Sequence, residues 1–542
     1  MSEARIMSRT REAGWLAAIL LSFLALAVFL ACYLVPWDDE FGYLIYGPLA
    51  WTGQLRLFQD EMTGQRLPLP YWVIGLSQVI TGTSLLTARL TSIGLGAMTI
   101  GLTFALGRVL AGPSGGFLSA LFLATHALVV GYYAGASYHA LSSLLLVAGL
   151  LAISRERPPV WPVLGMALIA GLWLCRANLA VMVPVVLGYL LVRARSRGEQ
   201  LALLLAGLLP VAVFLAWSQE HLKILAYVPL ASRLVEPLGY RSLFALQDFP
   251  EGKPFAESLW WLVRRHLPWV IATVILLASA LATRLGRPRV RWPSPPPLVV
   301  FMAILAVYAL GCQMVILNMY LKSVAAWMSA FAPLWAVVLG YCASVLLAPG
   351  QAPPPVRSGL ATALFALFAV SPVLSRHTAM PLTLPSQSVL GVLEDQAARI
   401  RAVVPPGERV FFFGTTPIPA HLAGARFYTQ QVLHTRTFVP DGDDYVVSRS
   451  GLWGPRQVDE WLSREARYAV VEPGLLDVYR TTEPGYHPAI DRIEAALARH
   501  FELVSEGGDG LWTPPFRVYR RKTPAPAAGL GSETSGPLQL PG

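Results

Sequence analysis

Residues 14–40 read GWLAAILLSFLALAVFLACYLVPWDDE. The apolar run from Gly14 to Val35 is long enough to cross a bilayer as a helix, which takes about 20 residues. It is long for a signal peptide and ends without a small-residue cleavage site, so we predict a retained membrane span. Three consecutive carboxylates follow it: Asp38, Asp39 and Glu40. Charged groups at a membrane boundary indicate a functional site.

The composition extends this interpretation to most of the chain. Of 542 residues, 55% are hydrophobic and 14% are charged, and the mean hydropathy is +0.52. These values predict a polytopic α-helical membrane protein. The four cysteines lie in or beside apolar segments, which favours neither a disulfide framework nor a zinc site. We expect about eleven spans, at residues 14–35, 88–110, 116–134, 137–153, 160–174, 178–192, 201–217, 268–282, 298–317, 323–347 and 359–374.

Basic residues in the short connections gather on one side of the predicted spans. Lys and Arg are retained on the cytoplasmic side during insertion. Arginines within 5–11, 155–157, 193–197 and 284–291, with Arg108 and Arg357, therefore predict a cytoplasmic N-terminus. The first loop (36–87), the long loop (218–267) and everything after residue 375 are then outside, and the short tails favour a bacterial inner membrane. This topology accounts for much of the net charge of +10, so no nucleic-acid partner is needed.

Residues 377–522 predict a small extracytoplasmic α/β domain that follows a membrane domain of residues 1–376. Apolar residues three and four apart predict a helix over 390–404. Short apolar runs predict strands at 409–413, 468–471 and 516–519, and Pro488 begins a second amphipathic helix. Pro, Ala, Gly and Ser dominate residues 523–542, which predicts a disordered tail.

Four motifs in the first part of the chain resemble, in order, those of a known family. They are Asp39-Glu40-Phe41-Gly42-Tyr43, then Gly53, then Arg66-Leu67-Pro68-Leu69-Pro70-Tyr71-Trp72, and then Ala88-Arg89-Leu90. The sequence is similar here to membrane glycosyltransferases of the GT-C class, in the protein O-mannosyltransferase and aminoarabinose transferase branch. The similarity is best over residues 36–195. It implies a GT-C fold and a polyprenyl-phosphate-linked sugar donor.

The resemblance also implies roles for individual residues. Asp39 resembles the general base that takes the acceptor hydroxyl proton, which is worth roughly 10²- to 10⁴-fold in rate. Asp38 and Glu40 are neighbouring catalytic candidates. A departing phosphate needs cations near its oxygens, and the candidates are Arg66, Lys322, Arg264 and Arg265. Candidate contacts to donor or acceptor are Tyr43, Glu61, Tyr71 and His139.

The chain departs from the family at two acidic positions. Gln65 stands where aminoarabinose transferases carry Glu before the basic residue, and His139 replaces a later acidic residue. The spacing of Asp60, Glu61 and His139 does not require a metal site. We therefore predict transfer without a metal ion or another cofactor.

Each candidate also has a purely structural alternative. Asp38 can cap a helix whose first turn holds the next two carboxylates. Arg66 fits a solvated interfacial cation, and Arg264 and Arg265 beside Trp260 and Trp261 fit a membrane-interface anchor. His139 fits a packed polar group, and Tyr132, Tyr133 and Tyr138 fit an interface belt. Asp441, Asp443 and Asp444 fit a polar turn, with a calcium loop as the alternative.

We predict an inverting membrane glycosyltransferase that moves a sugar from a polyprenyl-phosphate donor to an envelope glycan, lipid or protein on the outer face. The alternative is a transporter or flippase of lipid-linked saccharides. The sequence shows no internal repeat and no paired broken helices of the kind transporters use, which speaks against it. An inactive assembly subunit would leave the acidic triplet unexplained.

Overall fold

The computed structural model describes residues 3–36, 38–56, 67–155, 157–176, 179–217, 222, 225–226, 232–241, 255–286, 292–316, 327–376, 387–428, 431, 437–482, 484–508 and 514–522. By contacts the chain divides into two compact units, residues 1–391 and 392–542. Each unit is described by itself. The predicted tail, residues 523–542, lies outside the described residues.

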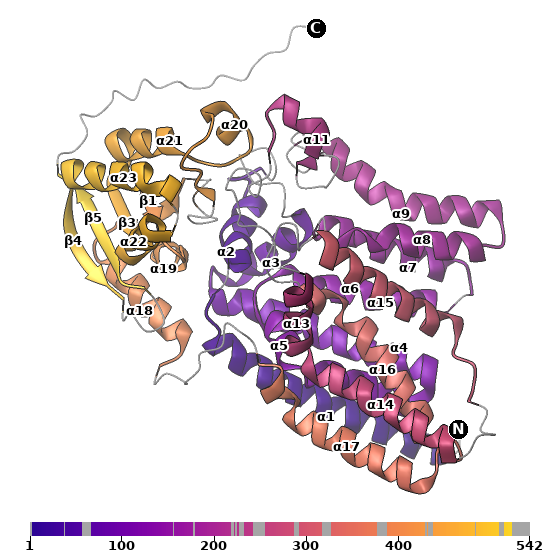
Figure 1. The fold of residues 1–542 in the computed structure, drawn as a ribbon. Helices are drawn as coiled ribbons and strands as arrows, with labels where there is room; N and C mark the ends of the chain where they lie inside the picture. The colour runs from indigo at the N-terminus through magenta and orange to yellow at the C-terminus, as the bar shows by residue number, and fades with distance from the viewer. Residues whose placement is uncertain are drawn as a thin grey trace. The chain divides into compact units, whose positions relative to one another are not determined.

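Unit 1 is built from helices (Figure 1). Among the described residues, seven of these helices are long and apolar enough to cross a membrane, or eight if the bent pair α5 and α6 counts as one span. The prediction of a polytopic helical membrane protein is therefore confirmed. The helices of unit 1 are α1 (Glu3–Tyr33), α2 (Asp38–Trp51), α3 (Pro68–Thr81), α4 (Leu85–Ala124), α5 (Ala127–Ala134), α6 (Tyr138–Ile153), α7 (Val160–Ala170), η1 (Gly171–Leu174), α8 (Met182–Arg193), α9 (Arg197–Trp217), α11 (Ser232–Val235), η3 (Glu236–Leu238), α13 (Phe255–Arg265), α14 (Leu267–Gly286), α15 (Pro297–Ile316), η4 (Trp327–Phe331), α16 (Ala332–Leu347) and α17 (Pro354–Leu374).

Helix α4 accounts for part of the difference between the eleven predicted spans and the seven or eight found among the described residues. It counts as one span, although the prediction placed two spans over most of its length. Its backbone leaves the helical region at Ala111 and at Gly112, which has φ +71. A Cβ on Gly116 would lie 2.7 Å from the Phe104 carbonyl oxygen, and one on Gly107 would lie 2.8 Å from that of Gly115. The two halves therefore turn back and pack backbone to backbone. The prediction also counted α7–η1 and α8, which are shorter apolar helices.

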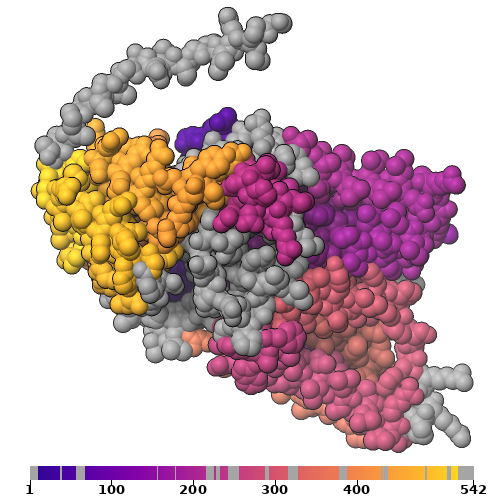
Figure 2. All heavy atoms as spheres, turned by 45° about the horizontal axis from the view of Figure 1, so that its top comes forward, coloured from indigo at the N-terminus to yellow at the C-terminus, as the bar shows by residue number. Residues whose placement is uncertain are grey.

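The outer helices of unit 1 present apolar side chains on their exposed faces. Examples are Leu205 of α9, Leu277 of α14 and Ile304 of α15, which are 54%, 65% and 59% exposed. Helices α7, α8 and α9 lie side by side (Figure 1) and form a continuous part of the surface in Figure 2. Exposed apolar faces of this extent suit the hydrocarbon of a bilayer.

Unit 2 contains a five-stranded mixed sheet in the order β2-β1-β3-β5-β4. Strands β2, β1 and β3 are parallel, and β5 pairs antiparallel with β3 and β4. Successive residues of β1 face opposite sides, as in any strand: Phe411 and Phe413 pack with Trp453 and Ile490, whereas Val410 and Phe412 pack with Ile400. The elements are α18 (Val389–Arg401), β1 (Arg409–Phe413), α19 (Ile418–Leu422), β2 (Arg426–Phe427), α20 (Asp444–Arg449), α21 (Pro455–Glu460), η6 (Trp461–Glu465), β3 (Tyr468–Val471), α22 (Pro473–Thr482), η7 (Pro484–Tyr486), α23 (His487–His500), β4 (Phe501–Gly507) and β5 (Phe516–Arg521).

The predicted elements of this unit are confirmed by α18, β1, β3, α23 and β5. The acidic turn before α20 has a structural role, because Asp443 Oδ1 accepts hydrogen bonds from the backbone N–H groups of Tyr445 and Val446 at 2.8 and 3.2 Å. Asp443 is thus the N-cap of α20. This arrangement agrees with the polar turn.

Candidate active site

Glu40, in the first turn of α2, forms a buried ion pair with Arg89 of α4. Arg89 Nε donates to Glu40 Oε1 and Arg89 Nη2 to Glu40 Oε2, both at 2.8 Å. Both side chains are fully buried. A guanidinium and a carboxylate joined by two parallel hydrogen bonds have the geometry that best compensates buried charge. The ion pair therefore fixes the start of α2 against α4.

Further hydrogen bonds extend this anchor to two other parts of unit 1. Arg89 Nη1 donates to the carbonyl oxygens of Ala31 and Leu34 at the end of α1. The backbone N–H of Ala136, in the turn between α5 and α6, donates to Glu40 Oε1 at 2.8 Å. The ion pair thus joins α1, α2, α4 and the turn between α5 and α6. Since both of its oxygens are engaged, Glu40 is poorly placed to accept a proton from a substrate.

Helices α2 and α3 touch without intervening side chains at two glycines. A Cβ on Gly75 would lie 2.4 Å from the carbonyl carbon of Gly47. Beside this contact the rings of Tyr43 and Tyr71 pack with centroids 4.9 Å apart, and both residues are fully buried. The structure therefore brings together two predicted contact residues, in the interface that positions α2.

A second polar cluster follows the turn at Ala136. His139 is 3% exposed and stacks on Tyr138, with centroids 4.1 Å apart. The Arg176 guanidinium carbon lies 4.7 Å from the centroid of the Tyr138 ring, and Arg176 is only 8% exposed. A buried guanidinium at this end of the bundle is an additional candidate for binding an anionic donor. Its sequence signal was its position as one of the few cations on the predicted outer side.

The interface-belt alternative is wrong for two of the three tyrosines. Tyr133 and Tyr138 are fully buried, and the Tyr133 hydroxyl donates to Ser143 Oγ at 2.8 Å. These rings pack inside the helical bundle because they continue the buried faces of α5 and α6. Residues of an interface belt would instead face the lipid headgroups.

Arg264 and Arg265 end the amphipathic helix α13. Their guanidinium carbons lie 5.5 and 5.3 Å from the centroid of the Trp261 ring. Phe255 and Trp260 of the same helix are each 62% exposed. Exposed aromatic rings beside arginines agree with an anchor at the membrane interface.

The remaining predicted site residues are only partly described. Asp38 and Asp39 begin α2, but their side chains lie outside the description. Asp60, Glu61, Arg66 and Lys322 also lie outside the described residues. Across the described ranges, no group of three or more His, Cys, Asp or Glu side chains is arranged to hold a metal ion. Metal-independent transfer remains a prediction.

Comparisons with known proteins bear on the fold and on part of the sequence. Residues 65–217 match the family model described as dolichyl-phosphate-mannose-protein mannosyltransferase. The crystal structure of ArnT from Cupriavidus metallidurans bound to undecaprenyl phosphate has a TM-score of 0.55 and 13% identity, covering 93% of this chain and 98% of that one. None of the curated proteins matches the chain in sequence.

A second solved structure with this fold is an oligosaccharyltransferase of Archaeoglobus fulgidus, crystallised with a tethered acceptor peptide. Its TM-score is 0.50 at 12% identity, and the match covers 94% of this chain and 74% of that one. Identities this low show the fold alone. The fold and the family match together define a membrane glycosyltransferase of the GT-C class that depends on lipid-phosphate sugars. The part of the chain that matches the family model of dolichyl-phosphate-mannose-protein mannosyltransferases, residues 65–217, lies within unit 1.

Proposed function

We propose that this glycosyltransferase transfers a sugar from a polyprenyl-phosphate donor to an envelope acceptor on the outer face of a bacterial inner membrane. The transfer inverts the configuration of the anomeric carbon. Asp39 is the general base that removes the proton from the acceptor hydroxyl. The observation that carries this assignment is the buried Glu40–Arg89 pair. This pair occupies the Glu40 carboxylate with structural hydrogen bonds. It also fixes the backbone at the start of α2, where Asp39 lies.

Inversion follows from attack on the sugar opposite the departing phosphate. A hydroxyl is a weak nucleophile until a carboxylate accepts its proton in the transition state. Negative charge grows on the leaving phosphate at the same time, and a guanidinium stabilises it with paired hydrogen bonds. Arg176 joins Arg66 and Lys322 as a donor-phosphate candidate, because it lies beside the cluster that follows the Ala136 turn. Glu40 has the role of a positioning residue.

The test is sugar transfer by the purified protein in lipid, with a panel of radiolabelled polyprenyl-phosphate monosaccharides and envelope extract as acceptor. Asp39→Asn should reduce transfer by roughly 10²- to 10⁴-fold. Asp38→Asn tests the neighbouring carboxylate separately. Asp441→Asn, in an exposed turn of unit 2, is the matched control and should leave transfer unchanged.

Active Asp39→Asn protein would overturn the mechanism. If no donor supports transfer, while lipid-linked sugar crosses the bilayer independently of Asp39, the protein is a flippase. Metal independence is tested in the same assay. Complete loss of transfer with a chelator, restored by one divalent ion, would contradict it.

A further inference from the structure

A cavity of about 290 Å³ lies at the other end of α6 from His139. Tyr138 begins this helix, whereas Ile153 and Ser154 at its far end line the cavity, roughly 22 Å away at 1.5 Å per residue. The wall is completed by the end of the first half of α4 and by parts of α7, α8, α9 and the start of α15. This arginine cavity, named for Arg193 and Arg195 in its wall, is therefore separate from the candidate active site.

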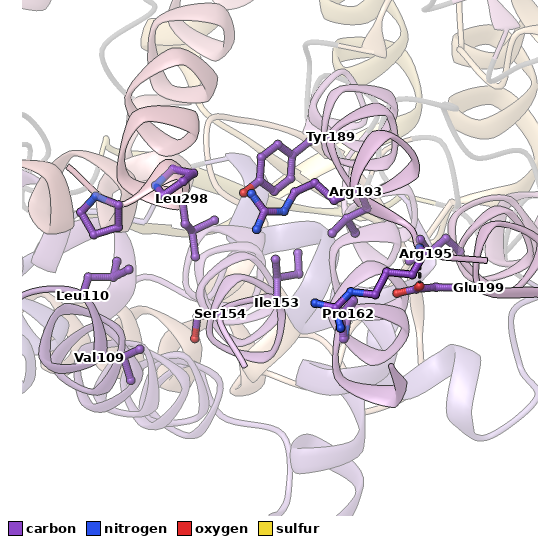
Figure 3. A pocket seen from close by; sticks show the side chains of 14 residues that line it. Val109, Leu110, Ile153, Ser154, Pro162, Tyr189, Arg193, Arg195, Glu199 and Leu298 are labelled. Carbon is purple, nitrogen blue, oxygen red and sulfur yellow. Dashed lines mark hydrogen bonds between the residues drawn. The ribbon is translucent and has the colours of Figure 1, made fainter. Parts of the chain in front are cut away.

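The polar side of the arginine cavity carries a net positive charge. Figure 3 shows Arg193 and Arg195 directed into the same space, with Glu199 beside Arg195. The Glu199 carboxylate is hydrogen-bonded to the backbone, because its Oε2 accepts the N–H of Arg195 at 2.8 Å. The backbone N–H of Glu199 in turn donates to Ser196 Oγ at 3.1 Å. Two guanidinium groups thus share the cavity with one carboxylate that caps α9. An anionic group is the ligand that this charge favours.

The position of Arg193 is supported by stacked rings. Its guanidinium carbon lies 5.4 Å from the centroid of the Tyr189 ring. That ring stacks on Phe301 of α15, with centroids 3.9 Å apart and an interplanar angle of 16°. A cation held over an aromatic face in this way loses less side-chain freedom when it binds a ligand.

The other side of the cavity is apolar. Leu110, Ile153, Leu190 and Leu203 line it, and Leu201 and Leu205 of the adjacent helix α9 are 58% and 54% exposed, as lipid-facing residues are. The volume suffices for roughly ten water-sized groups, which exceeds the need of a single ion or water. A ligand that combines an anionic head with a hydrocarbon chain fits both sides.

We propose that the arginine cavity binds an anionic phospholipid, with its phosphate between Arg193 and Arg195 and the beginning of an acyl chain against the leucine wall. The planar fork of a guanidinium pairs with two phosphate oxygens. All phospholipids carry this phosphate, but the cationic choline or ethanolamine group of a zwitterionic lipid would lie near two guanidinium groups of the same charge, which disfavours it. With the orientation proposed above, the lipid comes from the cytoplasmic leaflet, whose surface is negative. The site is independent of sugar transfer.

Native mass spectrometry of the full-length protein tests this proposal. The protein is released from detergent micelles that contain phosphatidylglycerol or phosphatidylcholine, and the lipid retained is counted against lipid concentration. Wild type should retain one phosphatidylglycerol at least about tenfold more tightly than phosphatidylcholine. The double variant Arg193→Gln/Arg195→Gln should lose this preference, and a large excess of inorganic phosphate should not displace the lipid.

Two further variants separate the cavity from general surface attraction. Arg197→Gln removes an exposed arginine of α9 that does not line the cavity, so it should retain the preference. Val109→Trp, at a 57% exposed position in the wall, should block the cavity without unfolding the protein and reduce retention about tenfold. The proposal fails if wild type shows no preference, if Arg197→Gln loses it as fully as the double variant, if Val109→Trp retains the lipid, or if free phosphate displaces it.

Discussion

Glu40 and Arg89 balance each other's charge inside unit 1, so removing either one leaves a buried ion behind. Taking one partner out of such a pair is costly, because the remaining charge has neither water nor a counterion. We expect Arg89→Met to lower the free energy of unfolding by about 3–5 kcal/mol. Thermal unfolding in detergent, followed by loss of the monodisperse peak in size-exclusion chromatography, measures the effect.

Arg241 provides the matched control for this prediction. It pairs with Glu236 at 3.1 Å, and the two side chains are 44% and 54% exposed. Exposed pairs contribute about 0–1 kcal/mol, so Arg241→Met should unfold close to wild type. Equal losses in Arg89→Met and Arg241→Met would show that the buried pair is not a structural anchor.

Arg176 differs from the exposed arginines because it is almost fully buried beside Tyr138. If it binds the donor phosphate, Arg176→Gln removes a charge-assisted contact that strengthens as the phosphate departs. We expect transfer to fall about 10²-fold or more in kcat, with Arg176→Lys restoring part of the rate. Steady-state kinetics with varied donor measures this. A purely structural role would lower the melting temperature of both variants and leave the kcat of the folded fraction unchanged.

At the scale of elements, the contact of α2 with α3 sets where the acidic triplet lies. A Cβ at Gly75 would overlap the backbone of Gly47, so Gly75→Ala should separate the helices and displace the start of α2. We expect transfer to fall at least about tenfold, since a displacement of 1 Å can cost 10²-fold. Transfer is compared with that of Gly94→Ala, whose added Cβ meets no atom within 4 Å. Gly94→Ala should be neutral or stabilising by up to about 1 kcal/mol, and a fully active Gly75→Ala would show that α2 tolerates the shift.

Glu472, directly after β3, ties the end of that strand to the residues that follow β1. Its Oε2 accepts the Thr415 N–H at 2.8 Å, and its Oε1 lies 3.1 Å from Thr415 Oγ1. Burial raises the pKa of Glu472 from 4.5 to about 7. The folded state therefore binds more protons than the unfolded state between these values, so the stability of unit 2 falls as pH rises from about 4.5 through 7.

The raised pKa of Glu472 predicts a pH-dependent opening of this region. Between pH 5 and pH 8, peptides covering β1 and β3 should exchange hydrogen faster after correction for intrinsic rates. The free energy of opening should fall by at most about 3 kcal/mol. Glu472→Gln should remove most of this dependence. The control Glu506→Gln, in an exposed pair with Arg517, should keep it. A Glu472→Gln profile that parallels wild type would contradict the assignment.

The elements with a simple period were predictable, and those defined by packing were not. The apolar spacing of α18 and α23 and the continuous apolar runs of β1 and β3 reflect burial that the sequence states directly. By contrast, β4 (Phe501–Gly507) alternates little and contains two glutamates, one of which pairs with Arg520 of β5. The turn inside α4 depends on close contacts between glycines on its two halves, which no local pattern displays.

At the scale of the whole molecule, the contacts of the candidate site could likewise not be predicted from local sequence patterns. The ordered motifs identified Asp39-Glu40 and Ala88-Arg89-Leu90 as features of one family, but not their contact across 49 positions in the chain. Ala136 reaches Glu40 across 96 positions. Such contacts exist only after the helices have assembled, because they join ends of elements whose order in space is set by packing. The sequence therefore indicated Asp39 as the candidate base, but not the ion pair that Arg89 forms with the neighbouring Glu40.

The orientation of the whole protein in the membrane decides which face carries out the reaction. Retention of arginines on the cytoplasmic side predicts that the connection between α8 and α9 is inside and that unit 2 is outside. In a background with all four cysteines replaced by alanine, a membrane-impermeant maleimide should label Asp441→Cys on intact cells. Gln200→Cys should react only after the cells are permeabilised. Both positions are exposed, so access to the reagent and not burial decides labelling. The reverse pattern would place sugar transfer on the cytoplasmic face and the arginine cavity in the outer leaflet, and a cytoplasmic marker protein that stays unlabelled in intact cells excludes leakage.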